Sequence, residues 1–369
     1  MSAGIGVLGA LQEAALRPLP ALAAGSLAGV ACSYTPLELL HAAGLVPLRL
    51  RAPGLPAPAA EAWLPSFACP LIRGVLGAAL TGRLDALAAV ILPHTCDSMQ
   101  ELAGIWRALR PAPPLLTFVE PLSLEGPRAP AYLRQELLSL AGRLEHLGRP
   151  VAAEALARSI VLYNRLRRAV QRIDSLRDRL AAAEAWAAIA AAWQMPPEHY
   201  LSLAEALIAE LEARPPRPAQ GPAVILAGSV LDEPLIPELI DALGGRVVGD
   251  DLCNGTRDAI TLAAESGDPW AALADRLLAR PACPAKHAPG APYAARLANL
   301  AARRGAQGVI QVLVKFCDPH GFEAVPAGQA LAASGTARLF LEVEAVNAPE
   351  QLRTRLQAFL EMLSAPADT

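Results

Sequence analysis

The chain has 369 residues, of which 53% are hydrophobic and 18% charged, and its net charge is −3. This length can bury a sizeable core and suggests two or three domains, while the absence of any Lys/Arg-rich run argues against a nucleic-acid partner. Lys286 and Lys315 are the only lysines, and neither follows the glycines of a phosphate-binding loop, so we expect no ATP hydrolysis by this chain.

The N-terminal stretch does not have the form of a secretory signal. It lacks a basic region before its apolar part, and Glu13 and Arg17 interrupt that part. The most apolar later stretch, AAAEAWAAIAAAW, spans about 13 residues, fewer than the ~20 that cross a bilayer. We therefore expect a cytoplasmic protein with no membrane contact, whose six cysteines do not pair as disulfides in that reducing compartment.

Strand-like and helical patterns alternate at both ends of the chain. Apolar runs typical of strands lie at residues 45–50, 87–93 and 113–121, with helical patterns between them. Residues from about 130 to 215 have helical spacing and no strand signal, and they end at the proline-rich linker EARPPRPAQGP. Strand-like runs then return at 222–230, 244–252, 306–315 and 337–345.

The predicted fold class is therefore α/β, with two parallel-sheet domains of Rossmann or flavodoxin-like type bridged by a helical segment. We assign residues 1–128 to an N-terminal α/β domain, 129–220 to the helical segment and linker, and 221–369 to a C-terminal α/β domain. Ligands of such folds bind at the carboxyl ends of the parallel strands.

All six cysteines lie outside the helical patterns. Three stand just ahead of an expected helix start, namely Cys32, Cys69 and Cys96. The other three lie among Gly, Pro, Asn and Asp residues that mark turns, namely Cys253, Cys283 and Cys317. A free cysteine is often a small buried hydrophobe, but six in loops favour metal ligation, because thiolates bind metals and a helix N-terminus lowers the pKa of a thiol.

Two of these helix starts can be predicted in detail. Thr35, Pro36 and Glu38 have the T-x-x-E spacing of a capping box, with Thr35 as the N-cap. Asp97 or Ser98 would cap the helix that follows Cys96. The positive ends of both helices would then lie beside cysteines.

The strand pattern also predicts which cysteines meet. Cys96 and Cys317 each follow a strand-like run, so they are expected to converge from the two domains at the ligand crevice. Cys32, which follows the stretch LAGVA, would complete a set of three.

Zinc is the alternative to an iron–sulfur cluster as the bound metal. Histidines lie near three of the cysteines, at His94, His287 and His320. Structural zinc sites, however, use closely spaced C-x₂₋₄-C pairs, and no two cysteines of this chain are that close. An iron–sulfur cluster is therefore the favoured interpretation.

Several segments resemble, in the same order, motifs of the 2-hydroxyacyl-CoA dehydratase and benzoyl-CoA reductase superfamily, which also contains double-cubane iron–sulfur proteins. They are CSYTPLELLHAAGLVPLRL, CPLIRGVLGAALTG, PHTCDSMQELAGIW, GGRVVGDDLCNGTRD and KFCDPHGFE, together with the terminal LEVEAVNAPEQLRTRLQAFLEML. The resemblance covers nearly the whole chain. It implies a [4Fe-4S] enzyme subunit that works beside a homologous second subunit or as a homodimer.

The resemblance further implies that a separate ATP-dependent iron–sulfur activator supplies a low-potential electron for radical dehydration or reduction of an acyl-CoA. Carried over by position, the ligands of the dehydratase cluster would be Cys32, Cys96 and Cys317. No catalytic side chain is assigned, and no motif of the sequence indicates CoA binding independently of the resemblance.

The remaining cysteines leave a second functional class open. Cys69, Cys253 and Cys283 resemble positions that double-cubane members use, where six cysteines hold an [8Fe-9S] cluster. The alternative is thus a double-cubane reductase of small molecules, or an electron-transfer or maturation protein that is not a catalyst.

Overall fold

The computed structural model describes residues 6–17, 25–51, 58–290, 292–344 and 349–365. In the N-terminal part, four parallel strands form a sheet in the order β2-β1-β3-β4. They are β1 (Leu27–Val30), β2 (Val46–Arg49), β3 (Ala89–Pro93) and β4 (Leu115–Phe118). Every residue of β1 and β3 is buried, which explains why these strands read as continuous apolar runs.

The C-terminal part repeats this topology with a second four-stranded parallel sheet, in the order β6-β5-β7-β8. Its strands are β5 (Ala223–Gly228), β6 (Arg246–Asp251), β7 (Gly308–Val314) and β8 (Ala337–Val343). Both orders follow the flavodoxin-like arrangement. The predicted α/β class with two parallel sheets is confirmed.

Helices follow the strands in both parts. The N-terminal part contains α2 (Leu37–Ala42), α3 (Pro58–Glu61), α4 (Pro70–Leu80) and α5 (Asp97–Leu109). The C-terminal part contains α10 (Leu235–Ala242), the 3₁₀ turn η3 (Thr256–Ala259), α11 (Pro269–Ala279), α12 (Tyr293–Arg304), α13 (Asp318–Ala333) and α14 (Pro349–Ser364).

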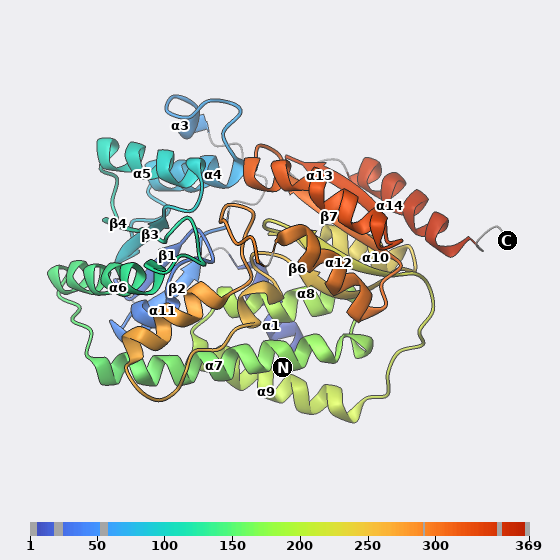
Figure 1. Cartoon of the computed structure of the whole chain (residues 1–369), viewed down its shortest axis with the longest axis horizontal. Coiled ribbons are helices and arrows are strands. Elements are labelled where there is room, and N and C mark those ends of the chain that lie inside the picture. Colours follow the sequence, from blue (N-terminus) through green and yellow to red (C-terminus); the bar gives the residue numbers. More distant parts are fainter. Residues whose placement is uncertain (1–5, 18–24, 52–57, 291, 345–348, 366–369) are drawn as a thin grey trace, which may run out of the picture.

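A helical segment lies between the two sheets in the sequence and contacts both parts. It consists of α6 (Ala129–His146), α7 (Ala153–Ser175), η1 (Arg177–Arg179), α8 (Ala182–Ala190), η2 (Ala191–Trp193) and α9 (Pro197–Ala213), and α1 (Val7–Leu16) packs onto it. Helices α7 and α9 run side by side below both sheets (Figure 1). No strand occurs between Phe118 and Ala223, and the domain limits at 128/129 and 220/221 stay predictions.

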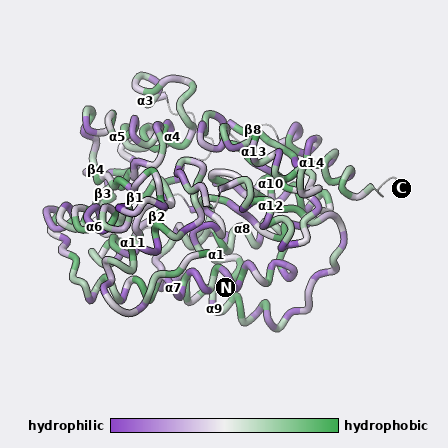
Figure 2. The backbone as a smooth tube through the Cα atoms, in the orientation of Figure 1, coloured by the Kyte–Doolittle hydropathy of each residue, from purple (hydrophilic) through white to green (hydrophobic). Residues whose placement is uncertain are grey.

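One continuous hydrophobic core holds the two sheets and the helical segment together. It contains Leu11 of α1, Val30 of β1, Leu166 of α7 and Val224 of β5. Two smaller cores lie under α4 and α5 in the N-terminal part and under α12 and α13 in the C-terminal part. Hydrophobic residues accordingly gather in the interior, while hydrophilic and hydrophobic residues alternate along outer helices such as α7 and α9 (Figure 2). Within the described ranges, no helix is long and apolar enough to span a membrane.

The predicted capping box at Thr35 is wrong. Helix α2 begins at Leu37 with Pro36 as its N-cap, and no side chain caps it. The Thr35 hydroxyl instead donates to the carbonyl oxygen of Cys32 at 2.9 Å. Glu38 is fully buried and lies 2.7 Å from the guanidinium of Arg167, because a buried cation attracts the carboxylate more strongly than a backbone amide does.

The predicted cap of α5 also differs in detail. The helix starts at Asp97, and Cys96 itself occupies the N-cap position without a side-chain cap hydrogen bond. The cysteine therefore stands directly at the helix end, one position closer than an Asp97 cap and two positions closer than a Ser98 cap would have placed it.

Candidate functional site

The carboxyl ends of both sheets deliver cysteines to one place. Cys32 follows β1, Cys96 follows β3, Cys253 follows β6 and Cys317 follows β7. These four thiols line a single cavity of about 860 Å³. Cys69 and Cys283 line the same cavity, so all six cysteines of the chain surround it. The cavity lies where α/β folds bind their ligands.

Three of the six cysteines occupy the N-cap position of a helix: Cys69 that of α4, Cys96 that of α5 and Cys317 that of α13. Burial raises the pKa of each thiol, that of Cys96 to about 12. Backbone amides of the first helical turns donate to these sulfurs and partly oppose the rise. The arrangement presents positive helix ends to any negative charge at the cavity wall.

The other three cysteines, Cys32, Cys253 and Cys283, lie beside buried polar and cationic groups. Arg257 Nη1 is 3.2 Å from Cys253 Sγ, and Asp251 pairs with the same guanidinium. A hydrogen bond from the Cys283 thiol lowers the pKa of Cys253 well below its usual value, against the effect of burial, and Arg257 adds to the decrease. On this side of the cavity, the anionic form of Cys253 is therefore stabilised.

The loop that carries Cys32 is held by groups from distant parts of the chain. Thr95 Oγ1 lies 3.6 Å from Cys32 Sγ. Arg280 donates to the carbonyl oxygen of Ser33 at 2.7 Å and to its hydroxyl at 3.2 Å. Burial raises the pKa of the Cys32 thiol, and nearby Cys253 contributes to the rise.

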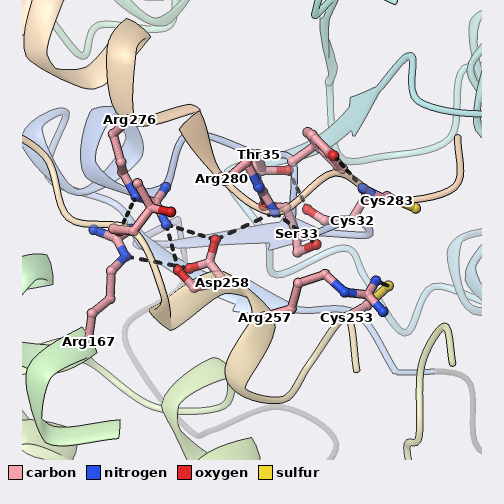
Figure 3. A network of polar contacts seen from close by, with 12 residues as sticks. Cys32, Ser33, Thr35, Arg167, Cys253, Arg257, Asp258, Arg276, Arg280 and Cys283 are labelled. Carbon is pink, nitrogen blue, oxygen red and sulfur yellow. Dashed lines mark hydrogen bonds and ion pairs between the residues drawn. The ribbon is translucent and has the colours of Figure 1, made fainter. Parts of the chain in front are cut away.

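Behind this loop lies a buried network of charges that joins all three parts of the chain (Figure 3). Asp258 of η3 lies 2.8 Å from Arg276 of α11, 3.5 Å from Arg280 and 3.6 Å from Arg167 of α7. Glu38 of α2 completes the set through Arg167. Because Arg280 also binds Ser33, the network fixes the position of Cys32 relative to the C-terminal part.

Two charged residues line the cavity as a buried pair. Lys286 Nζ is 3.8 Å from the Glu120 carboxylate, and both side chains are 1% exposed. Burial raises the pKa of Glu120 to about 7 although Arg280 and Lys286 oppose the rise. The pair sits in the cavity wall next to Cys283, whose carbonyl oxygen accepts the amide of Lys286 at 2.9 Å.

The histidines considered for zinc are divided between two cavities. His94 and His320 line the main cavity, whereas His287 lines an adjoining one of about 220 Å³. Within the described ranges, no three or more His, Cys, Asp or Glu side chains are arranged to hold one metal ion. Thiolates that hold an iron–sulfur cluster bind different irons and so stand further apart than the ligands of one ion.

Sequence reasoning missed the charged residues of this site. Arg49 and Arg257 lie within two of the segments that resemble family motifs, but no role was predicted from the sequence for them or for Glu120. Arg49 and Glu120 each stand at or just after the end of a predicted strand. Lys286 was notable only as one of the two lysines of the chain. The position after a parallel strand is the signal that could have identified Arg49 and Glu120.

Several known proteins are similar to this chain over most of its length. The family described as "2-hydroxyglutaryl-CoA dehydratase, D-component" matches residues 32–363. The beta subunit of lactoyl-CoA dehydratase from Anaerotignum propionicum is 27% identical and covers 97% of this chain and 98% of its own length. A benzoyl-CoA reductase subunit from Thauera aromatica is 27% identical over 78% of this chain and 77% of its own. The beta subunit of (R)-2-hydroxyglutaryl-CoA dehydratase from Acidaminococcus fermentans is 26% identical over 89% and 90%.

The family match spans nearly the whole chain and begins at the first cysteine of the cavity. This chain therefore belongs to the 2-hydroxyglutaryl-CoA dehydratase D-component family.

Proposed function

We propose that this chain is the iron–sulfur subunit of an enzyme that dehydrates or reduces an acyl-CoA. The relatives are subunits of acyl-CoA dehydratases and of a benzoyl-CoA reductase, which supports both the enzyme class and a partner subunit.

The single observation that supports the cofactor is the set of six thiols around one cavity. Thiolates are the ligands of iron–sulfur clusters, and the helix ends at Cys69, Cys96 and Cys317 favour the negative charge of such a group. The donor set therefore fits an iron–sulfur cofactor. When bound, that cofactor would supply low-potential one-electron chemistry and an iron that can polarise a carbonyl oxygen.

The position of all six cysteines on the same cavity favours a double-cubane [8Fe-9S] cluster over a single [4Fe-4S] cluster. If only Cys32, Cys96 and Cys317 were ligands, nothing in that role would require Cys69, Cys253 and Cys283 to line the same cavity.

Two large apolar side chains that line the cavity are exposed. Leu122 and Phe322 are 69% and 83% exposed, which suits the entry of an acyl group or the approach of a partner subunit.

The electron would come from an ATP-dependent iron–sulfur activator, which agrees with the lack of a phosphate-binding loop in this chain. The second candidate is a double-cubane reductase of small molecules, in which the same six thiols would hold the cluster.

Metal analysis after anaerobic purification tests the cofactor. Iron, zinc and acid-labile sulfide per chain would be measured for the wild type, for the C69A/C253A/C283A variant and for the C32A/C96A/C317A variant. The six-cysteine proposal expects about eight irons in the wild type and about half in each variant. If the wild type instead held about four irons, and if C69A/C253A/C283A kept them while C32A/C96A/C317A lost them, a single cluster held by Cys32, Cys96 and Cys317 would be supported. A wild-type chain with zinc or without metal would refute both.

Ligand binding separates the two candidate functions. Isothermal titration of the anaerobic protein with lactoyl-CoA and benzoyl-CoA, the acyl-CoAs in the names of relatives, should show saturable binding if the chain handles an acyl-CoA. Free coenzyme A serves as the control. Iron at full content with no response to either acyl-CoA, alone or with the partner subunit, would favour the small-molecule reductase.

A further inference from the structure

Arg49 lies in the wall of the cysteine cavity, at the end of a strand. It is the last residue of β2, where it pairs in register with Val30 of β1, the strand that leads to Cys32. The residue is 2% exposed and lines the cavity together with Cys32. Arg49 therefore places a buried positive charge at the carboxyl end of the N-terminal sheet, beside one of the proposed cluster ligands.

The surrounding residues hold Arg49 without neutralising it. Gln194 donates to the backbone carbonyl oxygen of Arg49 at 3.1 Å, and the guanidinium lies 5.7 Å from the centre of the Trp193 ring. Its Nε and Nη1 have no hydrogen-bond partner among the described residues. The helical segment thus fixes the strand end and one face of the guanidinium, and leaves donors free.

The other buried arginines of the described chain behave differently. Each lies within 4.0 Å of a carboxylate, and they are Arg167, Arg177, Arg257, Arg276 and Arg280. Arg49 is the one buried arginine of the described ranges for which no such pair is found. Because burying an unpaired charge is costly, a buried guanidinium with free donors at a cavity indicates an anion in that cavity.

We infer that Arg49 donates hydrogen bonds to the anionic sulfurs of the iron–sulfur cluster at the Cys32 end of the cavity and thereby raises the reduction potential of the cluster. This inference rests on the proposed function. The sulfur of Cys32 is the group that the observations favour, since Arg49 pairs with the strand that leads to Cys32 and both residues line the same cavity.

The expected effect of Arg49 on the reduction potential follows from general electrostatics. A cluster that accepts an electron becomes more negative, so a nearby fixed positive charge and N–H donors to sulfur stabilise the reduced state more than the oxidised state. Unlike Arg257, whose charge is shared with Asp251, Arg49 has no carboxylate within 4.0 Å among the described residues to weaken this effect. Arg49 is therefore a tuning residue that acts on the cofactor.

Redox titration monitored by electron paramagnetic resonance tests the inference. The reduction potential and the iron content would be measured for wild type, Arg49→Gln and Arg49→Lys. We expect Arg49→Gln to shift the potential to more negative values at unchanged iron content, and Arg49→Lys, which keeps the charge but not the planar fork of donors, to lie between the two. Arg51→Met is the matched control, since Arg51 is two residues further along the same segment, donates to the Asp232 carbonyl oxygen and is absent from the cavity lining. It should leave the potential unchanged.

The outcomes separate this inference from the proposed function. Wild-type potential in Arg49→Gln at full iron content would refute the inference and leave the cluster standing. If Arg49→Gln cannot hold iron, retention by Arg49→Lys supports a need for the charge, whereas equal loss in both variants assigns Arg49 a purely structural role and overturns the inference. A wild-type chain that binds no iron would refute the proposed cofactor, and this inference with it.

Discussion

Glu38 Oε1 and Arg167 Nη2 lie 2.7 Å apart, with side chains that are 0% and 1% exposed. The first residue belongs to α2 of the N-terminal part and the second to α7 of the helical segment. Through Asp258 and Arg280 the same network reaches Ser33, next to Cys32. The pair is therefore part of the support that holds a cavity cysteine in place.

Replacing Glu38 with glutamine should lower the free energy of unfolding of the iron-free chain by about 3 kcal/mol, because it leaves Arg167 with less compensation in a buried site. Urea unfolding at neutral pH measures the effect. The control is Glu205→Gln, which removes an exposed partner of Arg165 at 2.9 Å and should change stability by less than about 1 kcal/mol. Equal effects of the two changes would contradict the assigned role of Glu38.

Thr35 should matter through its hydrogen bond to the Cys32 carbonyl and not through a helix cap. We expect Thr35→Ala to lose about 1 kcal/mol of stability and to lower the amount of iron retained per chain, since the Cys32 turn is less well held. Thr35→Ser keeps the hydroxyl and should behave as the wild type. Wild-type stability and iron content in the alanine variant would show that this hydrogen bond contributes nothing.

The raised pKa of Glu120 predicts that the free energy of unfolding falls as the pH rises. Its pKa is about 7 in the folded chain, against 4.5 as the ordinary value, so between these pH values the folded state binds more protons than the unfolded state. The free energy of unfolding should therefore decrease across that window, by up to about 3 kcal/mol at 1.36 kcal/mol per unit of pKa. Glu120→Gln should flatten this slope, and unfolding at pH 5, 6, 7 and 8 would reveal it. If the stability of the wild type and that of Glu120→Gln changed equally with pH, the raised pKa of Glu120 would be refuted.

The lowered pKa of Asp251 predicts the opposite effect: the free energy of unfolding falls as the pH falls into the acid range. Burial would raise its pKa, but Arg257 and Arg296 outweigh that effect and lower the pKa to about 2. The unfolded carboxyl binds its proton near pH 4, so the stabilisation is complete above that pH and is lost as the pH falls toward 2. Asp251→Asn should cost about 2 kcal/mol at pH 7 and lose less on acidification than the wild type. The control is Asp275→Asn, an exposed change on α11, whose stability should vary with pH as that of the wild type does. If Asp251→Asn lost as much stability in acid as the wild type, the lowered pKa of Asp251 would be refuted.

Local chemistry in the sequence was sufficient for much of the fold. The strands appear as continuous apolar runs because both faces of a parallel sheet are buried, and residues 87–93 and 306–315 are clear examples. Turn residues and strand ends likewise placed all six cysteines in loops. These signals need no knowledge of distant residues, because burial of a strand and the chemistry of a turn are properties of a few consecutive positions.

Only the tertiary structure decided which residues meet. Cys69, Cys253 and Cys283 join the other three cysteines at one cavity because a shared hydrophobic core, built around the helical segment, orients the two sheets with their carboxyl ends toward one another. The same packing turned Glu38 from a predicted cap into the partner of Arg167, and it left Arg49 buried without a counterion among the described residues. Electrostatic roles of this kind depend on desolvation and on neighbours that are more than a hundred residues away in the sequence, so no local pattern can show them.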